Sequence, residues 1–292
     1  MAKVSVICIF LNAEHYLDEA VRSVLAQDFC NFELLLVDDG SYDGTTQLAR
    51  AYAAAHPDRV RYLAHPGRVN RGMSAARNLG LAHATGELIA FIDADDRWRP
   101  GKLAEQVAMM AAQPAIGMLA GTVNYWRSWT GGDDTLTPTG HRLDRPITPP
   151  GAALALYPVG EAAAPCPSDV MIRRNVLDRV GGFEDAFTGS FEDIAVFGKI
   201  FVTAPVWFSS RVWLDYRIHP DSSVAGMIAA GQYPARRRRF LQWYRDWLQD
   251  HGQADEVLRA VIRRLWRDRL RPATYRHTPL GRLTWTLREA LR

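Results

Sequence analysis

An apolar run of strand length ends directly in a cluster of acids near residue 90. Residues 87–92 read ELIAFI, and Asp93, Asp95 and Asp96 follow at once. These closely spaced carboxylates repel one another, so crowding them against a sheet is costly unless a positive partner joins them. Oxygen ligands suit Mg²⁺ or Mn²⁺, which take one or two carboxylates and complete their shell with substrate phosphates. The run therefore predicts a strand that delivers a divalent-cation site, and the alternative is a solvated acidic turn.

Apolar runs and helical patterns alternate along the N-terminal part of the chain. The expected strands are 4–11, 33–37, 60–64 and 87–92, and the expected helices are 17–25, 45–55 and 73–84. The first two strands are nearly continuous apolar runs, which is typical of strands buried in a parallel sheet. Asn12 is positioned to cap the first helix. The alternation predicts a doubly wound α/β sheet, whose ligands bind beyond the carboxyl ends of the strands, where the acids at 38–39 and 93–96 both fall.

Five sequence blocks carry a resemblance to a known family. In chain order they are VSVICIFLNAEHYLDEAVRSVLAQ, FELLLVDDGSYDGT, NRGMSAARNLGLAHATGELIAFIDADDRWRPGKL, GGF and FED. VDDGS or DxD alone occurs widely by chance, but the order and spacing of all the blocks, over about residues 4–220, are specific. The chain resembles the family 2 glycosyltransferases. The resemblance implies a GT-A fold, which is a Rossmann-like, mostly parallel α/β sheet flanked by helices, and an enzyme that uses a nucleotide-sugar donor with Mn²⁺ or Mg²⁺.

The resemblance also implies a nucleotide-binding side. The expected contacts are Phe10, Leu11, Asn12, Asp39, Arg77 and Asp93. Asp39 can accept a hydrogen bond from a ring N–H of uracil, thymine or guanine but would face a lone pair on cytosine, and the matching family aspartate holds uracil. Alternatively, Asp38 and Asp39 only cap the turn before the next helix, a role that fits Asp43 better. Leu11 departs from the family pattern, because many relatives carry there an aromatic residue on which uracil stacks.

Residues 70–78, NRGMSAARN, are similar to the family's NxGxxxARN block, whose arginine lies against the nucleotide. Gly72 lets a ligand approach the backbone closely, and Arg77 offers a planar fork to a base or a phosphate. A surface salt bridge is the alternative for Arg77. Arg71 is expected to be a solvated charge.

The resemblance distributes metal-site roles over two segments. Asp95 would bind the cation directly, and Asp93 would reach the ribose or a metal-bound water, which makes it a second candidate ligand. His219, in a YRIH segment, could contact the diphosphate or complete the metal shell, or it could only satisfy a local hydrogen bond. Arg217 could neutralise phosphate. Asp96 is expected to cap a helix or to support the ligands from behind.

The block Phe191-Glu192-Asp193 opens an expected helix over 194–202. By resemblance, Asp193 is the base that deprotonates the acceptor hydroxyl, and the neighbouring Glu192 is a candidate contact of the acceptor. The alternative is that both carboxylates only stabilise a helix N-terminus. One displacement by a hydroxyl, with a single base and no covalent intermediate, inverts the anomeric centre, and the base contributes roughly 10²–10⁴-fold.

Composition bounds the domain organisation and the compartment. The 292 residues are 48% apolar, which is enough for a substantial core. We expect a GT-A catalytic domain at 1–225 and a C-terminal helical extension at 226–292. The first apolar run is too short for a signal peptide, and no stretch approaches the ~20 apolar residues of a membrane span. Three cysteines without metal spacing indicate a reducing compartment, so we expect a cytoplasmic protein, with peripheral attachment to the inner face of the membrane left open.

Charge is concentrated in the C-terminal extension. Residues 236–292 hold 15 arginines, no lysine and six acids, a net charge of +9. Arginine and tryptophan on helical faces suit an anionic membrane, where a lipid-linked acceptor would be found, although the acceptor could also be a soluble saccharide. The alternative is that these helices pack on the catalytic domain or a second subunit, with their arginines solvated. No nucleic-acid motif accompanies the charge, so nucleic acid is not an expected partner.

Two further function classes stay open. A sugar nucleotidyltransferase of similar α/β form would carry a Gly-rich, basic phosphate loop after the first strand, and the sequence at 11–14, LNAE, is neither. A nucleotide-sugar-binding protein on the same scaffold, without turnover, would bind donor and transfer nothing. The Gly-, Pro- and Thr-rich residues 128–165 are expected to form a flexible loop bordering the acceptor side, with Asp133 and Asp134 as solvated turn residues.

Overall fold

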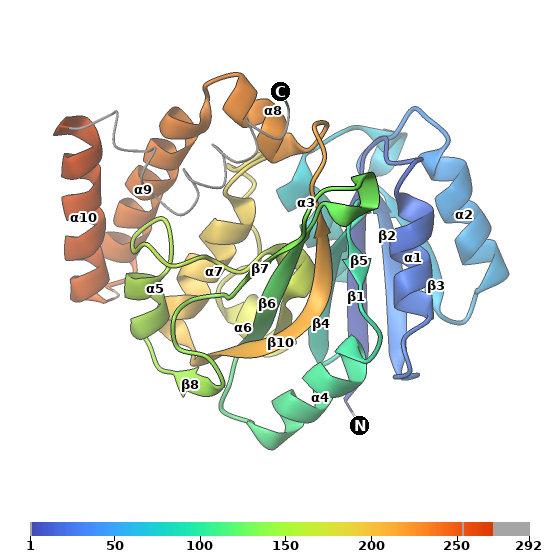
Figure 1. The fold of residues 1–292 in the computed structure, drawn as a ribbon, viewed down its shortest axis with the longest axis horizontal. Helices are drawn as coiled ribbons and strands as arrows, with labels where there is room; N and C mark the ends of the chain where they lie inside the picture. The colour runs from blue at the N-terminus through green and yellow to red at the C-terminus, as the bar shows by residue number, and fades with distance from the viewer. Residues whose placement is uncertain (1, 253, 271–292) are drawn as a thin grey trace.

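A ten-stranded mixed sheet forms the centre of the structure, a computed structural model that describes residues 2–252 and 254–270 (Figure 1). Its strands are β1 (Val4–Phe10), β2 (Phe32–Asp38), β3 (Val60–Ala64), β4 (Leu88–Asp93), β5 (Arg97–Trp98), β6 (Met118–Trp126), β7 (Thr135–Thr137), β8 (Arg145–Ile147), β9 (Met171–Arg173) and β10 (Val206–Arg217). The order is β3-β2-β1-β4-β9-β6-β10-β5, with β7 beside β6 and β8 beside β10. The first four strands of this order are parallel, whereas β9 and β5 run antiparallel to their neighbours.

Helices cover both faces of this sheet. They are α1 (Leu17–Leu25), α2 (Thr45–Ala55), α3 (Met73–His83), α4 (Lys102–Ala112), α5 (Gly151–Ala155), α6 (Arg174–Arg179), α7 (Glu192–Thr203), α8 (Ser223–Ala229), α9 (Tyr233–Asp250) and α10 (Asp255–Leu270). Short 3₁₀ turns lie at Pro66–Arg68, Ser128–Thr130 and Pro167–Asp169. Side chains of α1, α2 and α4 join the core on one face, and those of α3, α5, α6, α7, α9 and α10 join the core on the other.

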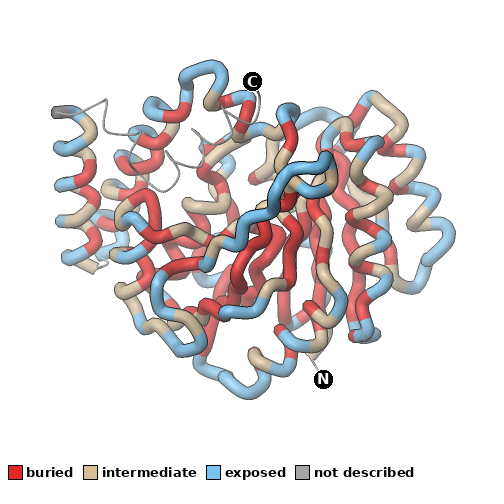
Figure 2. Tube along the Cα trace, viewed as in Figure 1, coloured by how far each residue is buried: buried red, intermediate tan, exposed pale blue. Residues whose placement is uncertain are grey.

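The N-terminal strands are buried on both faces, as their continuous apolar runs predicted. Every residue of β1 and β2 is buried (Figure 2). Because side chains alternate along a strand, Val6 and Cys8 of β1 join the core that contains α1, whereas Ile7 and Ile9 join the core that contains α7. The predicted GT-A-like α/β architecture is therefore confirmed.

The expected flexible loop at 128–165 is wrong in part, because this segment contains β7, β8 and α5. Strand β7 pairs with β6, which lies close by in the sequence, and β8 pairs with the distant strand β10, so pairing with the main sheet orders this segment. Asp134 is a fixed turn residue: it accepts hydrogen bonds from the backbone N–H groups of Arg127 and Ser128 at 2.9 and 2.8 Å. Asp133 is exposed, as expected.

Helices α9 and α10 pack on the same core as the sheet. Phe240 and Tyr244 of α9, and Val261 of α10, belong to the cluster that contains Ile7. Not all of the extension's arginines are solvated, since Arg237 is buried and pairs with Asp268. Residues 271–292 of the predicted extension lie outside the described residues, and the boundary near residue 225 stays a prediction.

Candidate active site

The carboxyl ends of β1, β2 and β4 meet at one edge of the sheet. Parallel pairing sets Phe10 opposite Asp38, and Ile9 opposite Asp93. The loops that follow these strands therefore lie together, and they carry most of the residues predicted for nucleotide and metal. The site is built from these loops, from α3, and from two later segments at the start of α7 and the end of β10.

The loop after β1 is tied to the loop after β2. Asn12 has a left-handed φ of 52° and does not cap α1, whose N-cap is Tyr16, so the predicted cap is wrong. Its Oδ1 instead accepts the N–H of Tyr42 at 2.9 Å. The Phe10 side chain lies in the core at 4% exposure, so it supports the site from beneath, whereas Leu11 is 42% exposed beside it.

Asp38 and Asp39 have separate tasks. Asp38 is fully buried and accepts hydrogen bonds from the backbone N–H of Ser41 at 2.7 Å and the hydroxyl of Thr46 at 2.6 Å, so it fixes the turn. Asp39 accepts the N–H groups of Arg71 and Gly72 at 2.8 and 2.9 Å, one on each oxygen. Burial raises the pKa of Asp39, and these two amides oppose the rise. Because each carboxylate oxygen has two lone pairs, Asp39 can still accept another N–H.

Arg77 is the central cation of the site. It is 1% exposed; Nη2 donates to Asp93 Oδ1 at 2.7 Å, and Nη1 donates to Glu192 Oε1 at 3.0 Å. One N–H of each terminal nitrogen therefore binds a carboxylate, and because Arg77 is buried the alternative of a surface salt bridge is wrong. Contact of Arg77 with a base or a phosphate stays a prediction. Burial alone would lower the pKa of Arg77, but Asp93 and Glu192 raise it above its ordinary value, so Arg77 stays charged.

The three acids after β4 have different surroundings. The Asp95 side chain is 33% exposed, and its Oδ2 lies 3.0 Å from Nε2 of His219. Asp96 is 1% exposed, and its Oδ1 accepts the N–H of Arg217 at 3.0 Å, so it supports the end of β10 and is not the cap of a helix. Burial, followed by the charges of Asp95 and Asp93, raises the pKa of Asp96 well above its ordinary value. The negative charge of these three acids is therefore not fully neutralised by the described cationic side chains around them.

The end of β10 supplies His219 and Arg217. The guanidinium of Arg217 pairs with Glu19, its Nε donates to the carbonyl of Asp95 at 2.7 Å, and it lies 4.4 Å from the ring centroid of Trp126. In this structure Arg217 contacts a carboxylate, a backbone carbonyl and an aromatic ring. Its predicted role in neutralising phosphate stays a prediction. Arg217 holds the Asp95 backbone and, through it, the side chain that faces His219.

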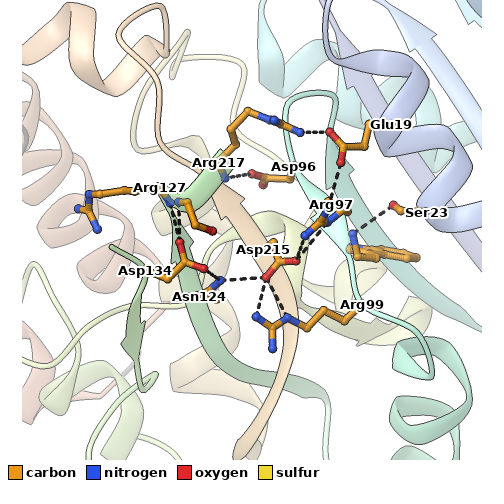
Figure 3. Close-up of polar contacts among 12 residues, drawn as sticks. Glu19, Ser23, Asp96, Arg97, Arg99, Asn124, Arg127, Asp134, Asp215 and Arg217 are labelled. Atoms are coloured by element: carbon orange, nitrogen blue, oxygen red, sulfur yellow. Dashed lines mark hydrogen bonds and ion pairs between the residues drawn. The ribbon is translucent and has the colours of Figure 1, made fainter. Parts of the chain in front are cut away.

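A polar network behind the acids was not predicted from the sequence (Figure 3). Asp215 of β10 accepts hydrogen bonds from Arg97 at 2.8 Å, from Arg99 at 2.8 Å and from Asn124 at 3.0 Å. Arg97 also pairs with Glu19 at 3.2 Å. The network fastens residues 97–99 to the sheet, and the alternation of Arg97, Trp98 and Arg99 after the acids was the available signal.

Asp95 and His219 are two candidate donors for a divalent cation. Among the residues that the structure describes, there is no group of three or more His, Cys, Asp or Glu side chains that could hold a metal ion. Asp95 and His219 form a two-donor pair, Asp93 ends β4 two residues before Asp95, and Oδ2 of Asp96 is buried without a described partner. Mg²⁺ and Mn²⁺ accept such a partial set when substrate phosphates supply the rest.

The start of α7 presents Glu192 and Asp193. Phe191, just before them, is buried with a left-handed φ of 63°, a conformation that costs free energy for a residue with a side chain. Glu192 is 5% exposed and bound to Arg77, and its Oε2 has no partner among the described residues. Burial and the neighbouring Glu192 carboxylate raise the pKa of Asp193 to about 7. A carboxylate with such a pKa suits proton transfer at neutral pH.

A model of the family described as "Glycosyl transferase family 2" matches residues 5–181 of the chain. The chain belongs to this family. The matched range contains Asp39, Arg77 and the acids after β4, whereas Asp193 and His219 follow it. The resemblance seen in the sequence is therefore confirmed, and the roles of the later residues are proposals.

Matches to two relatives of this family 2 glycosyltransferase cover only part of each relative's length. An uncharacterized glycosyltransferase of Nostoc sp. is 32% identical over 181 residues, which is 61% of this chain and 53% of the relative. The Escherichia coli UDP-Glc:alpha-D-GlcNAc-diphosphoundecaprenol beta-1,3-glucosyltransferase WfgD is 38% identical over 107 residues, 37% of this chain and 40% of the relative. The chain thus spans about half or less of these relatives. S. aureus TarS 1–349 in complex with UDP-GlcNAc matches with a TM-score of 0.70 and 19% identity over 97% of this chain and 78% of that one, which shows a shared fold.

Replacing Arg77 with methionine tests the ion bridge in this family member. Two carboxylates would be left buried without their cation, so Arg77→Met should lower the free energy of unfolding by about 3–5 kcal/mol near pH 8. The loss should shrink as the pH falls, because burial raises the pKa of Asp93 in the folded state and protonation removes its unpaired charge. Urea unfolding at several pH values measures this, with exposed Arg71→Met as the control. A pH-independent loss equal to that of the control would contradict the bridge.

Proposed function

We propose that this chain transfers a sugar from a nucleotide diphosphate donor, most simply a UDP-sugar, to a hydroxyl of a saccharide or lipid-linked acceptor, with inversion. The observation that carries the proposal is the ion bridge at Arg77. It joins Asp93, beside the candidate metal ligand Asp95, to Glu192, beside the candidate base Asp193, across 16 and 115 residues of sequence. Donor and acceptor chemistry thus meet at one buried cation.

Asp39 and Leu11 support a uracil-binding end of the site. Asp39 retains lone pairs for a ring N–H, and exposed Leu11 offers an apolar surface to the base. Asn12 and Asp93 lie on the neighbouring loops, where they could approach the ribose. TarS was solved with UDP-GlcNAc, and the name of the E. coli relative includes UDP-Glc, which agrees with a uridine donor.

Mn²⁺ or Mg²⁺ would be held by Asp95, His219 and Asp93, and when bound it would neutralise the charge that develops on the departing diphosphate. Arg77 binds a carboxylate through one N–H of each terminal nitrogen. Its task is to hold Asp93 and Glu192 at fixed positions on either side of the donor.

Asp193 would act as the base. Its Oδ1 accepts the N–H of Ile194 at 2.8 Å, so Oδ2 is the oxygen that would take the proton from the acceptor hydroxyl. The acceptor oxygen then forms a bond to the anomeric carbon while the bond from that carbon to the phosphate oxygen breaks. A single displacement of this kind inverts the anomeric centre.

The biological setting is proposed from the relatives and from the charge of the chain. The E. coli relative is named for a diphosphoundecaprenol acceptor, which agrees with surface polysaccharide or glycoconjugate synthesis. No helix among the described residues is long and apolar enough to cross a membrane.

We propose a catalytic domain at 1–225 and an extension at 226–292 that contacts anionic lipid on the cytoplasmic side, with exposed Trp266 as a candidate contact. A homo-oligomer stays a prediction.

Metal-dependent donor binding is the direct test of the nucleotide side. Calorimetry should show UDP binding that strengthens on addition of Mn²⁺ and weakens with EDTA, and Asp95→Ala should remove the Mn²⁺ dependence while leaving metal-free binding unchanged. Asp133→Ala, on an exposed turn, is the matched control. Full Mn²⁺ dependence in Asp95→Ala would refute Asp95 as the ligand.

Replacement of Asp193 tests the base. Asp193→Asn is nearly isosteric, so it should keep UDP affinity and the fold while lowering kcat by roughly 10²–10⁴-fold. In the wild type, kcat/KM should rise with pH through about 7, as Asp193 loses its proton, and then level off. The variant should lack this rise in a transfer assay with UDP-sugars. If the variant turns over at nearly the wild-type rate with the same pH profile, Asp193 is not the base.

A further inference from the structure

The segment before the candidate base is fastened from two sides. From α3, the Ser74 hydroxyl donates to the carbonyl of Phe187 at 2.8 Å. From α9, Arg236 Nη1 donates to the carbonyl of Thr188 at 3.0 Å and to the Ser190 hydroxyl at 3.1 Å. Arg239 Nη2 donates to the carbonyl of Ala186 at 2.9 Å. Residues 186–190 therefore have most of their described polar anchors on a helix of the C-terminal extension.

Aromatic packing repeats this connection. Phe191 stacks on Phe240 of α9 with ring centroids 5.6 Å apart, and it lies 5.5 Å from the ring of Tyr233. Phe187 meets Trp243 edge to face at 5.2 Å. Aromatic pairs in these arrangements stabilise a contact beyond the area they bury. The backbone of the segment and its two aromatic side chains thus rest on one face of α9.

The four consecutive arginines 236–239 point in different directions from α9. Residues three and four apart share a side of a helix, so Arg236, Arg239, Phe240 and Trp243 all face the segment. Arg237 turns inward to Asp268 and the carbonyl of Pro158, and Arg238 is exposed. Only part of the run is therefore free for an anionic partner.

The left-handed backbone of Phe191 needs such support. A non-glycine residue in this region persists only where its surroundings hold it. Phe191 directly precedes Glu192 and Asp193, so its conformation sets where α7 begins and where both carboxylates lie.

We infer that Arg236 is a positioning residue of the active site: from α9 it holds residues 188–190 so that Phe191 keeps its left-handed conformation and Asp193 faces the acceptor. The inference rests on the proposed role of Asp193 and extends it, because it makes α9 a working part of the catalytic unit. Arg236 touches neither donor nor acceptor in this account. Its loss should therefore affect turnover and leave donor binding unchanged.

The test compares Arg236→Ala with Arg238→Ala in the full chain, since both remove one charge from the same turn of α9. Misplaced catalytic groups lose rate steeply, so Arg236→Ala should lower kcat on the order of tenfold to a hundredfold, with the donor KM and UDP affinity unchanged. Arg238→Ala should behave as wild type. Arg236→Lys should recover most of kcat, because an ammonium can still donate to the Thr188 carbonyl.

Hydrogen exchange supplies a readout that is independent of transfer. In Arg236→Ala, amides of residues 186–192 should exchange faster while those of the sheet do not change. Should Arg236→Ala fail to fold, Ser190→Ala, which removes one acceptor of Arg236, should show the same exchange pattern and a smaller loss of kcat. Unchanged exchange and kcat in a folded Arg236→Ala, or equal losses in both arginine variants, would overturn the inference. Faster exchange together with an active Asp193→Asn would instead overturn the base assignment and leave the Arg236 anchor standing.

Discussion

One buried guanidinium holds the candidate active site together. Arg77 sits on α3 at 1% exposure and binds Asp93, at the end of β4, and Glu192, at the start of α7. A buried ion bridge of this kind contributes little net stability, because desolvating three charges offsets their attraction, but losing one partner is strongly destabilising. Its effect is therefore positional. It fixes the distance between the loop with the donor-side acids and the helix with the candidate base.

The rest of the site adds negative charge around that cation. Burial and neighbouring carboxylates raise the pKa of Asp93, Asp96 and Asp193, and Arg77 only partly opposes this for Asp93 and Asp193. Arg217 is nearby but is occupied by Glu19 and the backbone of Asp95. In the proposed function, these acids would hold a divalent cation on the donor side and supply a carboxylate that titrates near neutral pH on the acceptor side.

The sequence predicted the parts that local patterns encode. Continuous apolar runs identified β1, β2 and β4, and the parallel pairing of such strands brought Asp39 and Asp93 to one edge. Contacts between separate elements decided the rest. Strands β7 and β8 exist because β6 and β10 lie beside them, and a Gly- and Pro-rich segment does not reveal those partners. The sequence matched Arg77 to a base or a phosphate, because a guanidinium fork fits many acceptors, and only the fold shows that Asp93 and Glu192 also lie within its reach.

A crystal structure with UDP and Mn²⁺ tests the central claim most directly, because it shows what Arg77 binds when the donor nucleotide is present. The account predicts that Arg77 keeps both Asp93 and Glu192, that Asp95 would hold Mn²⁺, and that uracil lies against Asp39. It also predicts that Asp193 remains free to face the acceptor side. A structure in which Arg77 leaves these carboxylates to bind the diphosphate, or in which UDP lies away from this edge of the sheet, would contradict it.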